Sequence, residues 1–146
     1  MVRLEFSIEI ERTSEDIFDV VGNPENDVNW QSAVLAVSKL TPGPIRAGSQ
    51  YRHSLNILGH TMDAEVEISE RQPASGYVLQ CVCGPFSFET RVQLKPAKRG
   101  TLLDTIVEGR PTGVAHIAAV VLSRRRRGEI DRDLRTLKRL MEAGEL

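Results

Sequence analysis

The sequence predicts an α+β protein in which a curved antiparallel sheet of six or seven strands wraps around one long C-terminal helix. The residues from Gly113 to Leu146 carry apolar side chains at three- and four-residue spacing, and no proline follows Pro111, which is typical of a long helix. The residues before them alternate apolar and polar side chains between turn-rich connections, which indicates an antiparallel meander. A long helix with one apolar stripe needs a partner surface, and the sheet can supply it.

The composition indicates one globular domain over residues 1–146, with 40% hydrophobic and 27% charged residues. The net charge of −1 gives no reason to expect a nucleic-acid partner. The chain has no apolar run near the ~18 residues of a membrane span and no signal-peptide pattern. We therefore expect a cytoplasmic protein without stable membrane insertion.

Neither a metal nor a cofactor is expected. Cys81 and Cys83 lie two apart on one strand, where a disulfide between them would be strained, so we expect reduced thiols in the core or at a cavity wall. A zinc site needs four ligands, and the sequence has no second cluster of Cys and His. A Gly-rich phosphate loop is absent as well.

The N-terminal part predicts one strand and two short helices. Arg3–Glu11 alternates apolar and acidic or polar side chains, which indicates a half-buried strand. Thr13 is expected to cap a short helix, with Asp16 at its third position. Asn23-Pro24 ends that helix, and a second helical turn is expected around Glu25 to Trp30.

Six further strands are expected before the long helix, each ended by glycine, proline or polar residues. They are Val34–Leu40, Ser49–Leu58, Met62–Arg71, Tyr77–Cys83, Phe86–Leu94 and Thr101–Glu108. A sheet too curved to close on the helix would leave a cavity between the two.

The long helix is expected from about Gly113 to Ala143, with Thr112 as N-cap and Gly144 as its stop. In its second half we expect an apolar stripe toward the sheet, formed by Ile130, Leu134, Leu137 and Met141. The charged residues that we expect mostly to face away are Glu129, Asp131, Arg132, Asp133, Arg135 and Lys138.

The first half of the helix leaves two alternatives open. A straight helix would continue the stripe through Ser123 and His116, which would then face the sheet. A bend near Val120 would instead turn Ile117 and Val121 inward. Four consecutive arginines cannot all be solvated on a helix packed flush on a sheet, so we expect Arg126 or Arg127 to point toward it. That arginine could pair with a carboxylate such as Glu65 or Glu67, or extend its charged end to water.

Several phrases resemble the superfamily that contains the START lipid-transfer domains, the birch-pollen-allergen proteins and the bacterial polyketide cyclase/dehydrase-like proteins, often called SRPBCC. The phrases are residues 10–18 (IERTSEDIF), Asn23-Pro-Glu followed by Trp30, residues 48–51 (GSQY) and residues 107–113 (VEGRPTG). The resemblance spans the whole chain and implies the helix-grip fold, with a deep, mostly apolar cavity for a lipid, sterol or polyketide-sized ligand. One departure is Val120, where relatives often carry proline.

Three polar residues are candidates for catalysis. Tyr51 and His53 share strand parity and could polarise a carbonyl group, and His116, in the first turn of the long helix, could act as a general acid or base. Each could equally be a polar residue that lines a binding cavity. The residues expected to contact a ligand are Met62, Val66, Phe88, Val92, Leu103, Val107, Arg110, Val120 and Ser123.

Three classes of function fit these observations. The first is binding of a hydrophobic small molecule without catalysis. The second is a polyketide cyclase, aromatase or dehydratase-like enzyme that uses Tyr51, His53 and His116. The third is an interaction module that forms a homodimer through an outward apolar patch of Val114, Ile117 and Val121.

Overall fold

The computed structural model describes residues 2–57, 59–84, 86–109 and 115–146, and for residues 115–123 it describes the helical backbone alone. The elements follow in the order β1 (Val2–Ile10), α1 (Ser14–Val21), η1 (Pro24–Asn29, a 3₁₀ helix), β2 (Val34–Lys39), β3 (Gln50–Ile57), β4 (His60–Gln72), β5 (Gly76–Cys83), β6 (Phe86–Ala97), β7 (Gly100–Gly109) and α2 (Ala115–Glu142). This order confirms the predicted fold class, with seven strands in the sheet.

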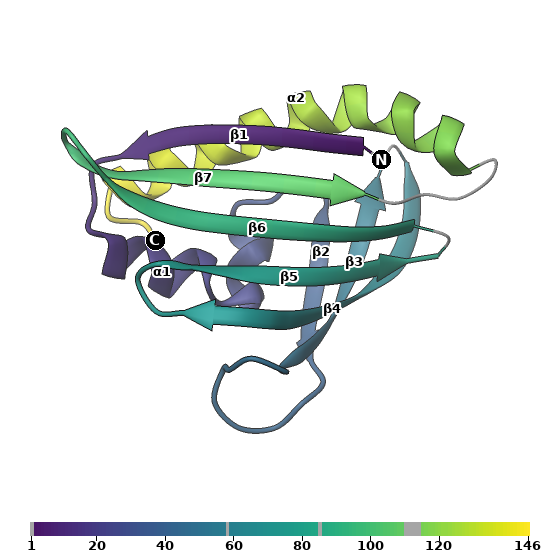
Figure 1. Cartoon of the computed structure of the whole chain (residues 1–146), viewed down its shortest axis with the longest axis horizontal. Helices are drawn as coiled ribbons and strands as arrows, with labels where there is room; N and C mark the ends of the chain where they lie inside the picture. The colour runs from purple at the N-terminus through teal and green to yellow at the C-terminus, as the bar shows by residue number, and fades with distance from the viewer. Residues whose placement is uncertain (1, 58, 85, 110–114) are drawn as a thin grey trace.

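The seven strands form one antiparallel sheet in the order β1-β7-β6-β5-β4-β3-β2. The first strand therefore pairs with the last, with Val2 opposite Gly109 and Ile10 opposite Thr101. The remaining neighbours follow the chain as hairpins. The sheet curls so strongly that β2 and β3 run across the direction of β1 and β7 in Figure 1, while α2 lies along β1.

Irregularities in two strands accompany this curvature. The pairing of β4 with β5 shifts between Ile68 and Glu70, and the pairing of β2 with β3 shifts between Val34 and Ala36. An extra residue in one strand bends it and increases its local twist. The outer part of the sheet can therefore turn toward the helix rather than extend the sheet as a flat layer.

The helix ends follow the predicted capping residues where the structure describes them. The hydroxyl of Thr13 accepts a hydrogen bond from the backbone N–H of Asp16 at 3.1 Å, as expected of an N-cap. At the end of α2, Gly144 has φ +74°, and its N–H donates to the carbonyl of Met141. The N–H of Glu145 donates to the carbonyl of Leu140, which completes a Schellman motif. Thr112, the expected N-cap of α2, lies outside the described residues.

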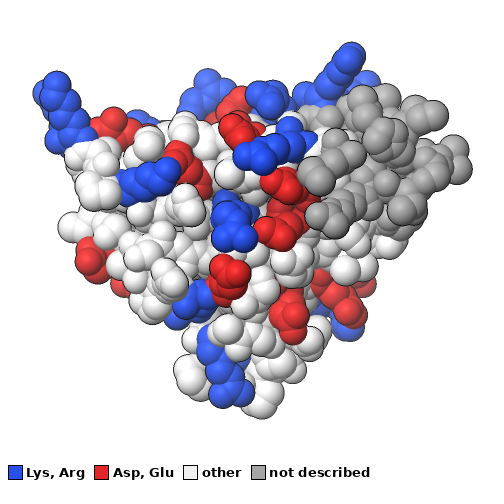
Figure 2. All heavy atoms as spheres, viewed as in Figure 1, with Lys and Arg blue, Asp and Glu red and all other residues white. Residues whose placement is uncertain are grey.

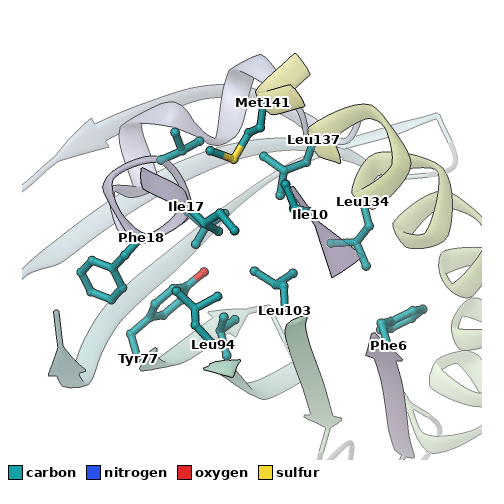
Figure 3. Close-up of a cluster of buried hydrophobic side chains, with 13 residues drawn as sticks. Phe6, Ile10, Ile17, Phe18, Tyr77, Leu94, Leu103, Leu134, Leu137 and Met141 are labelled. Carbon is teal, nitrogen blue, oxygen red and sulfur yellow. The ribbon is translucent and has the colours of Figure 1, made fainter. Parts of the chain in front are cut away.

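The apolar core lies under the C-terminal half of α2. Leu137 and Met141 are fully buried there and pack with Ile10 of β1, Ile17 of α1 and the buried leucines of β6 and β7 (Figure 3). The predicted stripe is thus the face that α2 buries. The prediction that Asp133 faces away was wrong, because its side chain is 7% exposed.

The surface carries charges of both signs. On the face in Figure 2, lysines and arginines alternate with aspartates and glutamates over the described atoms. Among the described residues, exposed ion pairs include Arg3 with Glu5 and Arg52 with Glu65. Exposed pairs of this kind contribute little to stability.

Candidate functional site

A cavity of about 370 Å³ lies between the concave face of the sheet, η1 and α2. Its wall is mostly apolar and takes side chains from all seven strands of the sheet. From α2 it takes Arg126, Ile130, Asp133 and Leu134, which lie on one face of the helix because they are spaced by three and four residues. The cavity thus begins where the packed core around Leu137 ends.

Six of the expected ligand contacts lie at this cavity. They are Met62, Val66, Phe88, Val92, Leu103 and Val107. Val92 and Leu103 are almost completely buried, whereas Phe88 is half-buried and stacks on Phe86 with a ring separation of 6.0 Å. Strand alternation sets these positions, because every second residue of a strand faces the same side of the sheet.

His53 and Asp27 form a buried polar pair in the cavity wall. Nε2 of His53 lies 3.0 Å from Oδ2 of Asp27, and the two residues are 5% and 6% exposed. Nδ1 of His53 is also buried and has no hydrogen-bond partner among the described residues. Burial raises the pKa of Asp27, and the hydrogen bond with His53 opposes that rise.

The 3₁₀ geometry of η1 places Asp27 at the cavity. Such a helix has about three residues per turn, so Pro24, Asp27 and Trp30 lie on one face. All three line the cavity. Asn23 caps η1 by accepting a hydrogen bond from the N–H of Glu25 at 3.1 Å. Sequence reasoning predicted this turn but missed Asp27, and the spacing of three from Pro24 to Trp30 was the available signal.

Tyr51 does not share the position of His53. Both face the same side of β3, as their parity predicted, but Tyr51 is fully buried with Val66 and Ile68 and is not among the cavity-lining residues. Its hydroxyl has no hydrogen-bond partner among the described residues. Burial raises the pKa of Tyr51, and the negative charge of Glu25 raises it further.

A second group of polar residues borders the cavity on α2. Asp133 accepts a hydrogen bond from the backbone N–H of Ser32 at 3.2 Å, and burial raises its pKa. Arg126 lines the cavity, and the guanidinium of Arg127 lies 5.8 Å from the ring centroid of Phe6 on β1, so both arginines lie toward the sheet where one was expected to. Arg126 pairs with a carboxylate, but with Glu129 of the same helix; Glu65 pairs with Arg52, and Glu67 accepts a hydrogen bond from Gln50.

The remaining sequence-based candidates, on this helix and just before it, have side chains outside the described residues. These are Arg110, His116, Val120 and Ser123, together with the outward patch of Val114, Ile117 and Val121. Their expected roles remain predictions.

The two cysteines are free thiols at the cavity wall. Sγ of Cys83 lies 3.0 Å from Sδ of Met62, and burial raises the pKa of Cys81 to about 11. At that pKa the thiol stays protonated and weakly nucleophilic near neutrality. Among the described residues, no three His, Cys, Asp or Glu side chains gather where they could hold a metal ion. None of the described helices is long and apolar enough to cross a membrane.

The model of the family described as polyketide cyclase / dehydrase and lipid transport matches residues 1–142. No curated protein matches the chain.

Solved structures show the same fold at low sequence identity. A protein from Rhodobacter sphaeroides superposes with a TM-score of 0.75 at 19% identity, covering 97% of this chain and 93% of its own. A START superfamily protein from Mycobacterium smegmatis gives 0.69 at 16% identity, covering 97% and 94%. Ara h 8.0201 gives 0.66 at 14% identity, covering 93% and 97%. These likenesses confirm the helix-grip architecture.

Proposed function

This chain belongs to the polyketide cyclase/dehydrase and lipid-transport family, and from that premise we propose that it binds a hydrophobic small molecule of lipid, sterol or polyketide type in the cavity between sheet and helix. The observation that carries the proposal is the apolar wall contributed by β4 to β7, opposite Ile130 and Leu134 of α2. The cavity volume of about 370 Å³ lies within the range of about 300–1,000 Å³ that is usual for small-molecule sites.

Apolar burial supplies the affinity in this proposal. Removing apolar ligand surface from water contributes roughly 25 cal/mol per Å², and a preformed wall of half-buried and buried side chains lowers the cost of ordering the site. Such a site selects ligands by shape and length, whereas the few polar groups in the wall orient the ligand.

Titration with oleic acid, followed by the emission of Trp30 and by thermal unfolding, tests the proposal. Trp30 is the chain's single tryptophan and lines the cavity, so its emission reports occupancy. We expect micromolar affinity and a rise in melting temperature, since ligand at 100 times its Kd stabilises the folded state by about 2.7 kcal/mol.

Two variants on β6 sharpen this test. Val92→Glu places a carboxylate in the wall and is expected to abolish the thermal shift, whereas Gln93→Glu adds the same charge on the exposed face of the same strand and should leave it unchanged. Phe88→Glu repeats the first change at a half-buried position that tolerates charge better, which separates lost binding from lost folding. Equal binding by all variants, or no binding by the unmodified protein, would refute the proposal.

A cyclase- or dehydratase-like activity is the second candidate, and the Asp27–His53 pair favours it. For this activity Nδ1 of His53 has to carry a lone pair, with the imidazole proton on Nε2 facing Asp27. It then removes a proton next to a substrate carbonyl and returns it to the leaving hydroxyl, which departs as water. With an apolar β-hydroxy ketone as substrate, growth of the conjugated enone absorbance would report this reaction. We expect His53→Phe to abolish it, and an equal rate in that variant would exclude His53 from catalysis.

A further inference from the structure

The buried pair of Asp27 and His53 has one nitrogen left over. Nε2 of His53 is engaged by Asp27 at 3.0 Å, while the buried Nδ1 has no partner among the described residues. Both residues line the cavity, Asp27 from η1 and His53 from β3. A buried polar atom without a partner costs free energy comparable to a lost hydrogen bond. A ligand that forms a hydrogen bond with Nδ1 removes this cost, and the removed cost adds to its binding free energy.

The proton count of the pair decides whether Nδ1 donates or accepts. With no net charge, the pair is either a carboxylate with an imidazolium or a carboxylic acid with a neutral imidazole that accepts at Nε2, and in both arrangements Nδ1 carries hydrogen. With one proton fewer, the remaining imidazole proton faces Asp27, and Nδ1 becomes an acceptor. In the state without net charge Nδ1 is a hydrogen-bond donor, and in the state with one proton fewer it is an acceptor.

The surroundings favour the state without net charge. Burial raises the pKa of Asp27, so an unbalanced negative charge on the pair is disfavoured. Tyr51 from β3 and Tyr77 from β5 are electrostatically coupled to Asp27, and burial raises the pKa of both, so both are neutral. At Tyr51 the negative charge of Glu25 raises the pKa more than the positive charge of Arg71 lowers it, so this wall does not favour a further negative charge. On α2, the same cavity is bordered by Asp133 and by Arg126, which pairs with Glu129.

We propose that the Asp27–His53 pair fixes a hydrogen-bond donor at Nδ1 of His53, and that the ligand of this cavity is an apolar molecule whose carbonyl oxygen accepts from it. This inference rests on the proposed binding function and adds the chemical class of the ligand's polar group. An apolar body fills the space between β4 to β7 and α2, and its carbonyl lies at the wall formed by η1 and β3. Because neighbouring side chains cover Nδ1, a small rotation of the His53 ring or of those neighbours is part of this binding mode. A hydrocarbon of the same shape leaves Nδ1 without a partner.

A matched pair of fluorescent probes tests this assignment. The first is 6-propionyl-2-dimethylaminonaphthalene, an apolar ketone, and the second is 6-propyl-2-dimethylaminonaphthalene, which lacks only the carbonyl oxygen. We expect the ketone to bind the unmodified protein about tenfold more tightly, as a net hydrogen bond of about 1.4 kcal/mol requires. The infrared carbonyl stretch of the bound ketone should lie at the lower frequency of a hydrogen-bonded group.

Variants assign the donor. His53→Phe removes the donor at Nδ1 and should bring the affinities of the variant for the ketone and for the propyl probe within about twofold of each other. Arg52→Gln changes the neighbouring residue on the outer face of β3, where Arg52 pairs with Glu65 at 3.8 Å, and should keep the preference. Binding of the propyl probe to His53→Phe also shows that this variant folds.

The outcomes separate the inference from the function on which it rests. Equal affinities for the two probes, with a carbonyl stretch at its aprotic frequency in the unmodified protein, would overturn the carbonyl assignment and leave apolar binding standing. A ketone preference that survives His53→Phe would overturn the role of His53. Binding of neither probe to the unmodified protein would overturn both proposals.

Discussion

Leu137 and Leu134 lie one turn apart on α2, but truncating them should have different consequences. Leu137 is fully buried in the packed core and does not border the cavity, whereas Leu134, also buried, lines the cavity. Leu137→Ala removes about three carbon groups, worth about 2.4 kcal/mol of transfer free energy, and opens a new void among tightly packed neighbours. We expect a total loss of about 3–5 kcal/mol.

Leu134→Ala should cost less, about 2–3 kcal/mol, because it enlarges an existing space rather than creating a separate one. At about 3 °C per kcal/mol, the two variants should differ in melting temperature by roughly 3–6 °C. Guanidinium unfolding followed by Trp30 emission and by circular dichroism measures both losses. Arg135→Ala, an exposed position on the same helix, should change stability by less than about 0.5 kcal/mol. Lys138 is a poorer control because its ammonium donates to the carbonyl of Glu9 at 2.6 Å.

The two leucine variants should also differ in their preference among fatty acids of different length. Leu134→Ala should shift the chain-length preference for fatty acids toward longer molecules, and Leu137→Ala should leave it unchanged. Equal stability losses, or a change in ligand preference confined to Leu137→Ala, would refute the division of α2 into a core half and a cavity half.

Two further predictions concern groups on α2. Burial raises the pKa of Asp133 in the folded protein above its ordinary value of 3.8. Its ionisation therefore lowers the stability of the folded state as the pH rises from 3.8 to that raised pKa. Asp133→Asn keeps an acceptor for the N–H of Ser32 and should stabilise the protein at about pH 7 by roughly 0.5–2 kcal/mol, with the gain lost below about pH 3.8, as urea unfolding at both pH values would show. Gly144→Ala forces a side chain onto φ +74° and should cost about 1 kcal/mol in the same assay, and an unchanged midpoint would show that the Schellman turn does not hold the end of the helix.

The fold could be predicted because its signals are local. Alternation identified the strands, and spacing of three and four residues identified the buried face of α2. The six apolar residues that the structure places at the cavity are residues of like parity on three strands, two each on β4, β6 and β7. Each of these inferences needs only neighbours in sequence and the geometry of one element.

The polar part of the site could not be predicted in the same way, because it depends on contacts between distant elements. Asp27 and His53 are 26 positions apart, and their contact requires both the 3₁₀ form of η1 and the curl of β3 toward it. Tyr51 shows the converse: parity gave its face correctly, but only the packing of Val66 and Ile68 around it explains why it lies outside the cavity wall. Asp133 is buried because Ser32, from the segment after η1, offers it a backbone N–H.

The pairing of β1 with β7 has a consequence for how the chain reaches this structure. During synthesis, β1 is made first of the seven strands but cannot pair until β7 has been made, since Val2 pairs with Gly109. Such distant pairing lowers the folding rate, because a long loop must close before its contacts form. Until then β1 is an unpaired strand with a row of apolar side chains, and association with another chain competes with folding. We therefore expect the yield of folded protein to depend more on how quickly β7 finds β1 than on the stability of the finished sheet.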